Sequence, residues 1–118
     1  MKQPEWKIRL KIDPEQDAAL IIMNEAQKHS SFSPFELMTY RLAVHEAVLN
    51  ALKYGGGEAV LTAFGNAGKM QVEIRQKNKI IWPNLVRPFR GVALIKRYAQ
   101  TEISDNSRTL ILRFLKYF

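Results

Sequence analysis

Apolar and basic side chains alternate in the first stretch of the chain, which reads WKIRLKI at residues 6–12. A period of two is typical of a strand with one face buried and the other in water. We therefore expect the chain to open with a half-buried strand whose outer face carries Lys7, Arg9 and Lys11.

Two helix-start signals follow this strand. The run DPEQ offers Asp13 as an N-cap with proline in the first helical position, so we expect a helix from there to about Lys28. The run SPFE offers Ser33 as the next cap, and Glu36 stands where a capping box needs its side chain. This second helix should run to Tyr54, because three consecutive glycines come directly after it.

The second half of the chain returns to a period of two. Residues 58–64, 69–76 and 108–118 are predicted strands, the first two joined by the turn GNAG, and a short helix is expected at 91–99. The element order is strand, two helices, two strands, helix, two strands. It predicts one domain over residues 1–118, an α/β (α+β) two-layer sandwich with a mixed, mostly antiparallel sheet and about three helices on one face.

Composition excludes several classes of chemistry. The chain contains no cysteine, which rules out disulfides, zinc-thiolate sites and thiol catalysis. It has no continuous apolar run of about twenty residues, and its start does not resemble a signal peptide. We therefore expect a cytoplasmic protein that does not associate with a membrane.

The net charge of +7 is concentrated in the second half, where 11 basic residues face 3 acidic ones between residues 59 and 118. This asymmetry favours an anionic partner such as a nucleotide phosphate, an acidic protein face or nucleic acid. The alternative is a basic surface with no particular ligand. Trp82, Phe89 and Tyr98 lie near basic residues, but nothing resembles a nucleic-acid-binding signature, so nucleic acid is the least favoured partner.

Polar residues interrupt the apolar pattern of the long second helix. Glu46, Asn50 and Lys53 are four and three residues apart, which places them on one face. This stripe is either the solvent side of an amphipathic helix or the wall of a cleft. In a cleft, the carboxylate can accept a proton and the amide oxygen can join the ligands of a phosphate-bound Mg²⁺.

The run HEAVLNALKYG, which contains this stripe, resembles the N-box of the GHKL ATPases, most closely that of the small anti-sigma-factor serine kinases. The resemblance implies a histidine-kinase-like ATPase domain of the Bergerat fold, with ATP and Mg²⁺ as cofactors. It also implies that Glu46 is the catalytic acidic residue, that Asn50 chelates the metal, and that Lys53 approaches the phosphates.

Two further segments are similar to the same family. FRGVALIKRYA looks like its phosphate-binding run, which implies that Arg90 and Gly91 lie at the phosphates, at the N-terminus of a helix. The alternative is that Gly91 is a turn residue and Arg90 a surface charge. In the last segment, SRTLILRF, Thr109 takes the place of the family's threonine that reaches toward adenine.

The chain departs from the family at the adenine-binding motif D-x-G-x-G. Gln76 replaces the aspartate, and Asn78 and Ile80 replace the two glycines. A glutamine carbonyl can still accept a hydrogen bond, but the branched isoleucine occupies space that a glycine leaves open. The segment at residues 82–89 is also shorter than the lid of the active kinases.

Two functions agree with this mixture of retained and replaced residues. The first is a regulator that holds ATP with Mg²⁺ through Asn50, with Gln76 and Asn78 among its other cofactor-binding residues. It phosphorylates a serine of a small antagonist protein and sequesters a sigma factor. The second is a degenerate pseudo-enzyme of the same fold that binds a protein partner without ATP turnover. Both allow a homodimer through the first strand, because the edge of that strand needs cover.

Overall fold

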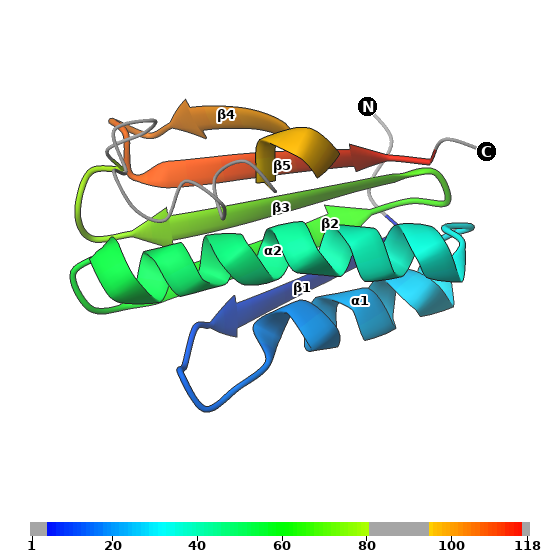
Figure 1. Cartoon of the computed structure of the whole chain (residues 1–118), viewed down its shortest axis with the longest axis horizontal. Coiled ribbons are helices and arrows are strands. Elements are labelled where there is room, and N and C mark those ends of the chain that lie inside the picture. The colour runs from blue at the N-terminus through cyan, green and yellow to red at the C-terminus, as the bar shows by residue number, and fades with distance from the viewer. Residues whose placement is uncertain (1–4, 81–94, 117–118) are drawn as a thin grey trace.

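The computed structural model describes residues 5–80 and 95–116, which form a five-stranded sheet with helices packed on one face (Figure 1). All four strand pairings are antiparallel, and the strand order is β1-β2-β3-β5-β4. The predicted two-layer α+β sandwich is confirmed. The elements are β1 (Trp6–Lys11), α1 (Ala18–His29), α2 (Pro34–Tyr54), β2 (Ala59–Gly65), β3 (Lys69–Gln76), a short helix that includes residues 95–98, β4 (Gln100–Ser104) and β5 (Thr109–Leu115).

The start of α2 agrees with the sequence prediction. Ser33 Oγ accepts a hydrogen bond from Glu36 N at 3.1 Å, and Glu36 Oε1 accepts one from Ser33 N at 2.8 Å. This capping box pairs two backbone N–H groups at the helix end. At the other end, α2 stops at Tyr54, and Gly56 and Gly57 continue the chain with φ values of 84° and 129°.

The predicted start of α1 at Asp13 is wrong. Asp13 instead closes a turn, in which its Oδ1 accepts from Glu15 N and its carbonyl oxygen accepts from Gln16 N. The N-cap is Asp17, whose Oδ1 accepts from Leu20 N at 3.0 Å. Asp17 also receives a hydrogen bond from Arg41 of α2 at 2.9 Å, a tertiary contact that favours this later start.

The final strands also differ from the prediction in their bounds. Sequence analysis placed one strand at residues 108–118 and did not locate its neighbour, which the structure shows at Gln100–Ser104. The turn between β4 and β5 contains three successive residues with positive φ, Asp105, Asn106 and Ser107. The predicted helix at 91–99 is described only from residue 95, where residues 95–98 are helical.

The core lies between the sheet and the two long helices. Strand β2 alternates buried and partly exposed residues throughout, with Ala59, Leu61 and Ala63 facing the helices. Helix α2 presents small buried side chains to the sheet, among them Ala43 and Ala47. The opposite face of the sheet carries the alternate residues of each strand. In the described part of the chain, no helix is both long and apolar enough to cross a membrane.

Candidate functional site

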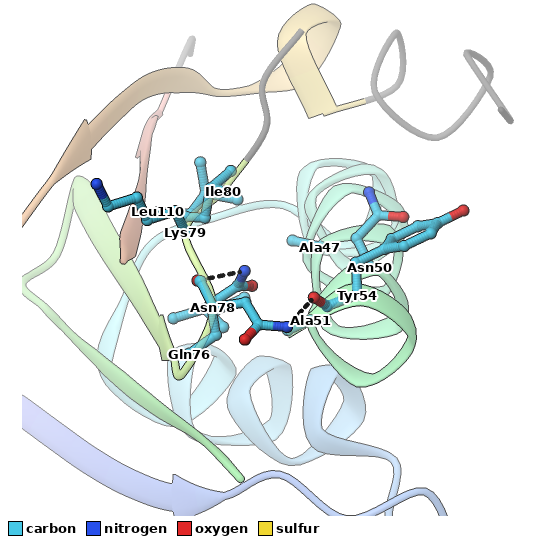
Figure 2. Close-up of a pocket in the computed structure, with 10 residues that line it drawn as sticks. Ala47, Asn50, Ala51, Tyr54, Gln76, Asn78, Lys79, Ile80 and Leu110 are labelled. Carbon is cyan, nitrogen blue, oxygen red and sulfur yellow. Dashed lines mark hydrogen bonds between the residues drawn. The ribbon is translucent and has the colours of Figure 1, made fainter. Parts of the chain in front are cut away.

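A pocket of about 520 Å³ lies between α2 and the adjoining ends of β3 and β5 (Figure 2). Its walls are mostly apolar, and a few amide groups lie among the apolar side chains. Volumes of this size are typical of small-molecule sites. The lining residues are Ala47, Asn50, Ala51, Tyr54, Ile74, Gln76, Asn78, Lys79, Ile80 and Leu110.

The helical wall of the pocket is formed by successive turns of α2. Ala47 and Ala51 are both buried, and their short side chains leave room between the helix and the sheet. Asn50 and Tyr54 lie beside them on the same wall (Figure 2). No hydrogen bond between described residues engages the Asn50 amide, which is partly buried. This amide is therefore available to a ligand.

The strand wall of the pocket combines an apolar floor with one oriented amide. Ile74 of β3 and Leu110 of β5, directly opposite each other in the sheet, form this floor. Gln76 Nε2 donates to the carbonyl oxygen of Asn78 at 3.0 Å, which fixes the orientation of the glutamine amide. Its Oε1 has no donor among the residues at 5–80 and 95–116, so the acceptor end of this side chain is the available one.

Asn78 fastens the end of this wall to the C-terminus of α2. Its Nδ2 donates to the carbonyl oxygen of Tyr54 at 3.2 Å (Figure 2). Its backbone N–H donates to the carbonyl oxygen of Gly55 at 2.9 Å. Carbonyl groups at a helix end lack partners within the helix, so these two bonds satisfy groups that would otherwise need water. Asn78 lines the pocket, but one N–H of its side-chain amide is used to hold the end of α2.

Ile80 contributes an apolar side chain to the pocket where the resembled family has a glycine. Its backbone N–H donates to the carbonyl oxygen of Ser107 at 2.6 Å, which ties this segment to the β4–β5 turn. Because its backbone is held in this way, the Ile80 side chain occupies part of the pocket and reduces the space for a ligand.

Glu46 and Lys53 lie outside the main pocket. Both line a shallower hollow of about 370 Å³ on α2, together with Leu49, Asn50 and Leu52. The Lys53 ammonium lies 5.4 Å from the centre of the Tyr54 ring, a cation–π distance. Asn50 lines both cavities. It therefore lies at the junction between the apolar pocket and the hollow, where the Glu46 carboxylate and the Lys53 ammonium are found.

Thr109 is not brought to the pocket. Residues alternate along β5, and Leu110 faces the pocket, so Thr109 lies on the opposite face of the sheet. There its hydroxyl is 3.4 Å from Asp105 Oδ2, and Asp105 also accepts from Arg75 at 3.1 Å. The proposed contact of Thr109 with adenine is therefore not supported by its position. Arg90 and Gly91 lie outside the described residues.

The residues that sequence analysis missed are the apolar ones that give the pocket its shape. Ala47 and Ala51 carry a signal in principle, because two alanines four residues apart leave a gap along one side of a helix. No local sequence pattern identifies Ile74 and Leu110 as pocket residues, since their strands become neighbours only in the folded sheet.

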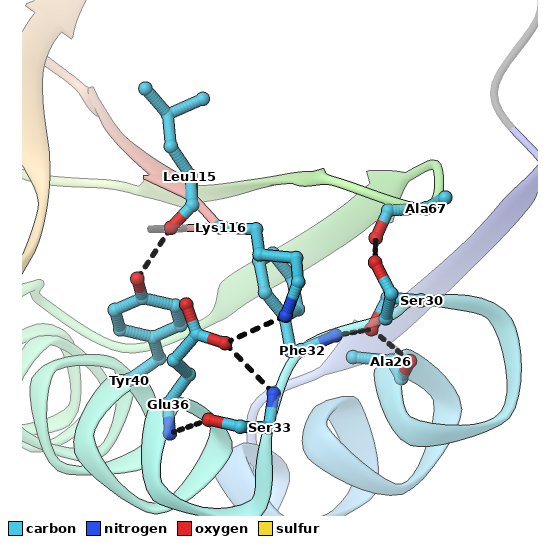
Figure 3. Close-up of polar contacts among 10 residues, drawn as sticks. Ala26, Ser30, Phe32, Ser33, Glu36, Tyr40, Ala67, Leu115 and Lys116 are labelled. Carbon is cyan, nitrogen blue, oxygen red and sulfur yellow. Dashed lines mark hydrogen bonds and ion pairs between the residues drawn. The ribbon is translucent and has the colours of Figure 1, made fainter. Parts of the chain in front are cut away.

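A polar cluster at the other end of α2 has a structural role (Figure 3). The Glu36 carboxylate is buried, and besides its capping contact it lies 3.4 Å from Lys116 Nζ. The Tyr40 hydroxyl donates to the carbonyl oxygen of Leu115 at 2.5 Å. These contacts fasten the end of β5 to α2, far along the helix from Asn50.

No three histidine, aspartate or glutamate side chains within the described ranges are grouped so that they could hold a metal ion. The expected metal ligand, Asn50, can supply one oxygen, and a Mg²⁺ bound with a nucleotide takes its other ligands mainly from phosphates and water. Comparison with known proteins adds no assignment: no protein-family model matches the chain, and no curated protein matches it.

Proposed function

We propose that the protein binds a purine nucleotide in the pocket between α2 and the ends of β3 and β5, and acts as a cytoplasmic regulator of the anti-sigma-factor or serine-kinase type. The observation that carries the proposal is the position of Asn50, which joins an apolar pocket to a hollow lined by Glu46 and Lys53. A nucleotide has the same two parts, a flat apolar base and a charged phosphate chain.

The base fits the larger cavity on chemical grounds. Ala47, Ala51, Ile74 and Leu110 supply apolar walls, and burying a ring against them is favourable. Gln76 supplies an acceptor, since its amide nitrogen is held by the Asn78 carbonyl oxygen. An adenine amino group can donate to this acceptor, which gives the site a preference for adenine over an apolar ring.

The phosphates would lie at the junction and in the hollow on α2. There the Asn50 side-chain oxygen would enter the coordination shell of Mg²⁺, and the Lys53 ammonium would offset phosphate charge. Glu46 would accept the proton of the attacking serine hydroxyl of a partner protein.

The second candidate is a pseudo-enzyme that uses the same surface to bind a protein partner. Two observations favour it. Ile80 occupies part of the pocket, and Asn78 uses its amide nitrogen to close α2 rather than to contact a ligand. Under this hypothesis the pocket accepts an apolar side chain of the partner, and no phosphoryl group is transferred.

Isothermal titration calorimetry with ATP and ADP, each with and without Mg²⁺, tests nucleotide binding directly. We expect saturable binding that Asn50→Ala weakens most strongly in the presence of Mg²⁺. Asn24→Ala is the matched control, because Asn24 is an exposed asparagine on α1, away from both cavities. Absence of heat at millimolar nucleotide, from protein shown to be folded by circular dichroism, would contradict the proposal and favour the pseudo-enzyme.

A pocket-filling variant separates the base site from general phosphate binding. In Ala47→Leu the larger side chain projects into the cavity, so adenine nucleotides should lose affinity while inorganic triphosphate should not. Glu46→Gln should retain nucleotide affinity and lose phosphoryl transfer to a serine substrate. Equal transfer by Glu46→Gln and the unmodified protein would exclude Glu46 as the proton acceptor.

A further inference from the structure

Among the described residues, strand β1 forms one edge of the sheet and pairs with β2 on one side only (Figure 1). An edge strand presents a row of backbone N–H and C=O groups that can pair with another extended chain. The nucleotide pocket is formed by β3, β5 and α2, so this edge is separate from it.

The register shows which residues of β1 present those groups outward. Ile12 N donates to the carbonyl oxygen of Ala59 at 2.8 Å, and Ile12 and Ala59 continue the register in which Lys11 lies opposite Val60. Hydrogen-bonded and non-hydrogen-bonded pairs alternate along an antiparallel ladder. The outward N–H and C=O groups therefore belong to the odd-numbered residues Lys7, Arg9 and Lys11.

The same three residues carry the positive charges of the strand. Their side chains are exposed on the face of the sheet away from α1 and α2. Lys7 and Arg9 have no ion-pair partner among the described residues, and Lys11 pairs with Glu58 at 2.9 Å, a contact in which both side chains are largely in water. The residues whose backbone groups point outward are thus the same ones that carry exposed positive charge, and two of them, Lys7 and Arg9, carry it without an ion-pair partner in the described part of the chain.

These charges oppose pairing of β1 with a second copy of itself. An antiparallel pair centred on Arg9 places Arg9 opposite Arg9 and Lys7 opposite Lys11, and like charges directly opposite each other destabilise a sheet. The edge is therefore protected against self-association and complementary to an acidic strand.

We propose that β1 is a docking site for an extended acidic segment of a partner protein, which adds to the sheet as a further strand. Its acidic residues occupy alternate positions, opposite Lys7, Arg9 and Lys11. The residues between them are apolar, because their side chains lie beside Ile8 and Leu10, which are only partly buried at the rim of the core. Backbone hydrogen bonds supply affinity and the alternation supplies specificity.

The test is fluorescence anisotropy with a labelled peptide in which glutamate and valine alternate. The control peptide has the same composition, with the glutamates grouped at one end. We expect saturable binding of the alternating peptide and at least roughly tenfold weaker binding of the control, because only the alternating peptide can pair its backbone and its charges together. Equal affinity of the two peptides would overturn strand addition.

Two substitutions at one position separate backbone from charge. Arg9→Ala and Arg9→Pro both remove the guanidinium, but only proline also removes the outward N–H, and it leaves the bonds to β2 intact. We expect Arg9→Pro to bind roughly three to ten times more weakly than Arg9→Ala. Lys69→Ala, at an exposed lysine of β3, should bind like the unmodified protein.

Charge reversal provides a test that does not require proline to be tolerated. The double variant Lys7→Glu, Lys11→Glu should lose affinity for the glutamate peptide. It should gain affinity for a peptide in which lysine and valine alternate. Failure of this exchange would overturn the proposal. Tighter binding of single-stranded DNA than of the peptide, with a steep dependence on salt, would also overturn it and would indicate a nucleic-acid partner. A dimer of the unmodified protein that dissociates in Arg9→Pro would likewise overturn it, because β1 would then pair with a second copy of itself.

Discussion

Asn78 shows at the residue scale how a position can resemble a ligand contact and yet serve the fold. The family resemblance placed it at adenine, and it does line the pocket. Its side chain, however, donates to the carbonyl oxygen of Tyr54 at the end of α2. We therefore expect Asn78→Ala to lower the free energy of unfolding by about 1 kcal/mol, the usual worth of one such hydrogen bond.

Urea denaturation followed by circular dichroism measures this loss. Asn78→Asp should lose more stability, because a carboxylate accepts but does not donate and places negative charge at a helix C-terminus. Asn50→Ala, which removes no hydrogen bond to a described residue, is the control and should unfold at nearly the same denaturant concentration. An unaltered stability of both Asn78 variants would contradict the structural role.

Gly56 is a second residue whose identity the backbone requires. Its φ of 84° lies in the left-handed region, and a Cβ atom there would be 2.4 Å from the Asn78 amide. Gly56→Ala should therefore cost about 1–2 kcal/mol of unfolding free energy. Gly68→Ala is the matched control, since a Cβ at Gly68 meets open space. An equal loss of unfolding free energy in Gly56→Ala and Gly68→Ala would show that position 56 does not require glycine.

At this scale, sequence spacing predicted the stripe on α2 but not which of its members reaches the pocket. Glu46 and Asn50 are one helical turn apart, yet four residues advance the helix by about 40° beyond a full turn. That rotation brings Asn50 to the edge of the pocket, while Glu46 lines the outer hollow. Thr109 fell on the wrong face for a related reason, because a shift of one residue in a strand reverses the side chain.

At the scale of elements, the two helix starts show when a local signal suffices. The capping box at Ser33 and Glu36 was predicted correctly because both partners lie within the motif itself. The start of α1 was not, because Asp13 and Asp17 are both competent caps and proline follows the first. The contact of Asp17 with Arg41 comes from a different helix, and no local pattern contains it.

The cap at Asp17 makes stability depend on pH. Its hydrogen bond from Leu20 N, followed by that from Arg41, lowers the pKa of the Asp17 carboxyl in the folded state. A lowered pKa means that the stabilisation is present above the unfolded value of about 3.9 and is lost as the pH falls through the folded value. Asp17→Ala should cost about 1 kcal/mol near neutral pH.

Thermal or urea unfolding at several pH values checks this prediction. The difference in stability between the unmodified protein and Asp17→Ala should shrink as the pH falls below about 4. Asp13→Ala is the control and should cost less at neutral pH, because Asp13 closes only an exposed turn. A difference that grows on acidification would show that the carboxylate is not the stabilising form.

At the scale of the whole molecule, the layers were predictable and the neighbours in the sheet were not. The alternation of apolar and polar residues, together with the helix caps, was sufficient to predict a two-layer sandwich. The order β3-β5-β4 depends on contacts between strands far apart in the chain, and the pocket requires that order because it brings Leu110 beside Ile74. The basic face of β1 was predicted from the alternation at residues 6–12, but its position at an edge of the sheet depends on the strand order.

The placement of the two proposed sites leads to a prediction about the molecule as a whole. The pocket lies against β3 and β5 on the helical face, whereas the docking edge is on β1, with β2 between β1 and β3. Sites that share no residue and are separated by a strand are expected to bind independently. The affinity of the alternating peptide should therefore change by less than about twofold when nucleotide is saturating.

Reciprocal variants make this independence measurable. Ala47→Leu should lose affinity for nucleotide and retain its affinity for the peptide. Arg9→Pro should lose affinity for the peptide and retain its affinity for nucleotide, so each proposed site can be tested without the other. In a double-mutant cycle the coupling should be below about 0.5 kcal/mol, the usual limit for separate sites. A coupling well above that value would mean that β2 transmits a change between β1 and the pocket wall, and that the sheet moves as a unit when either ligand binds.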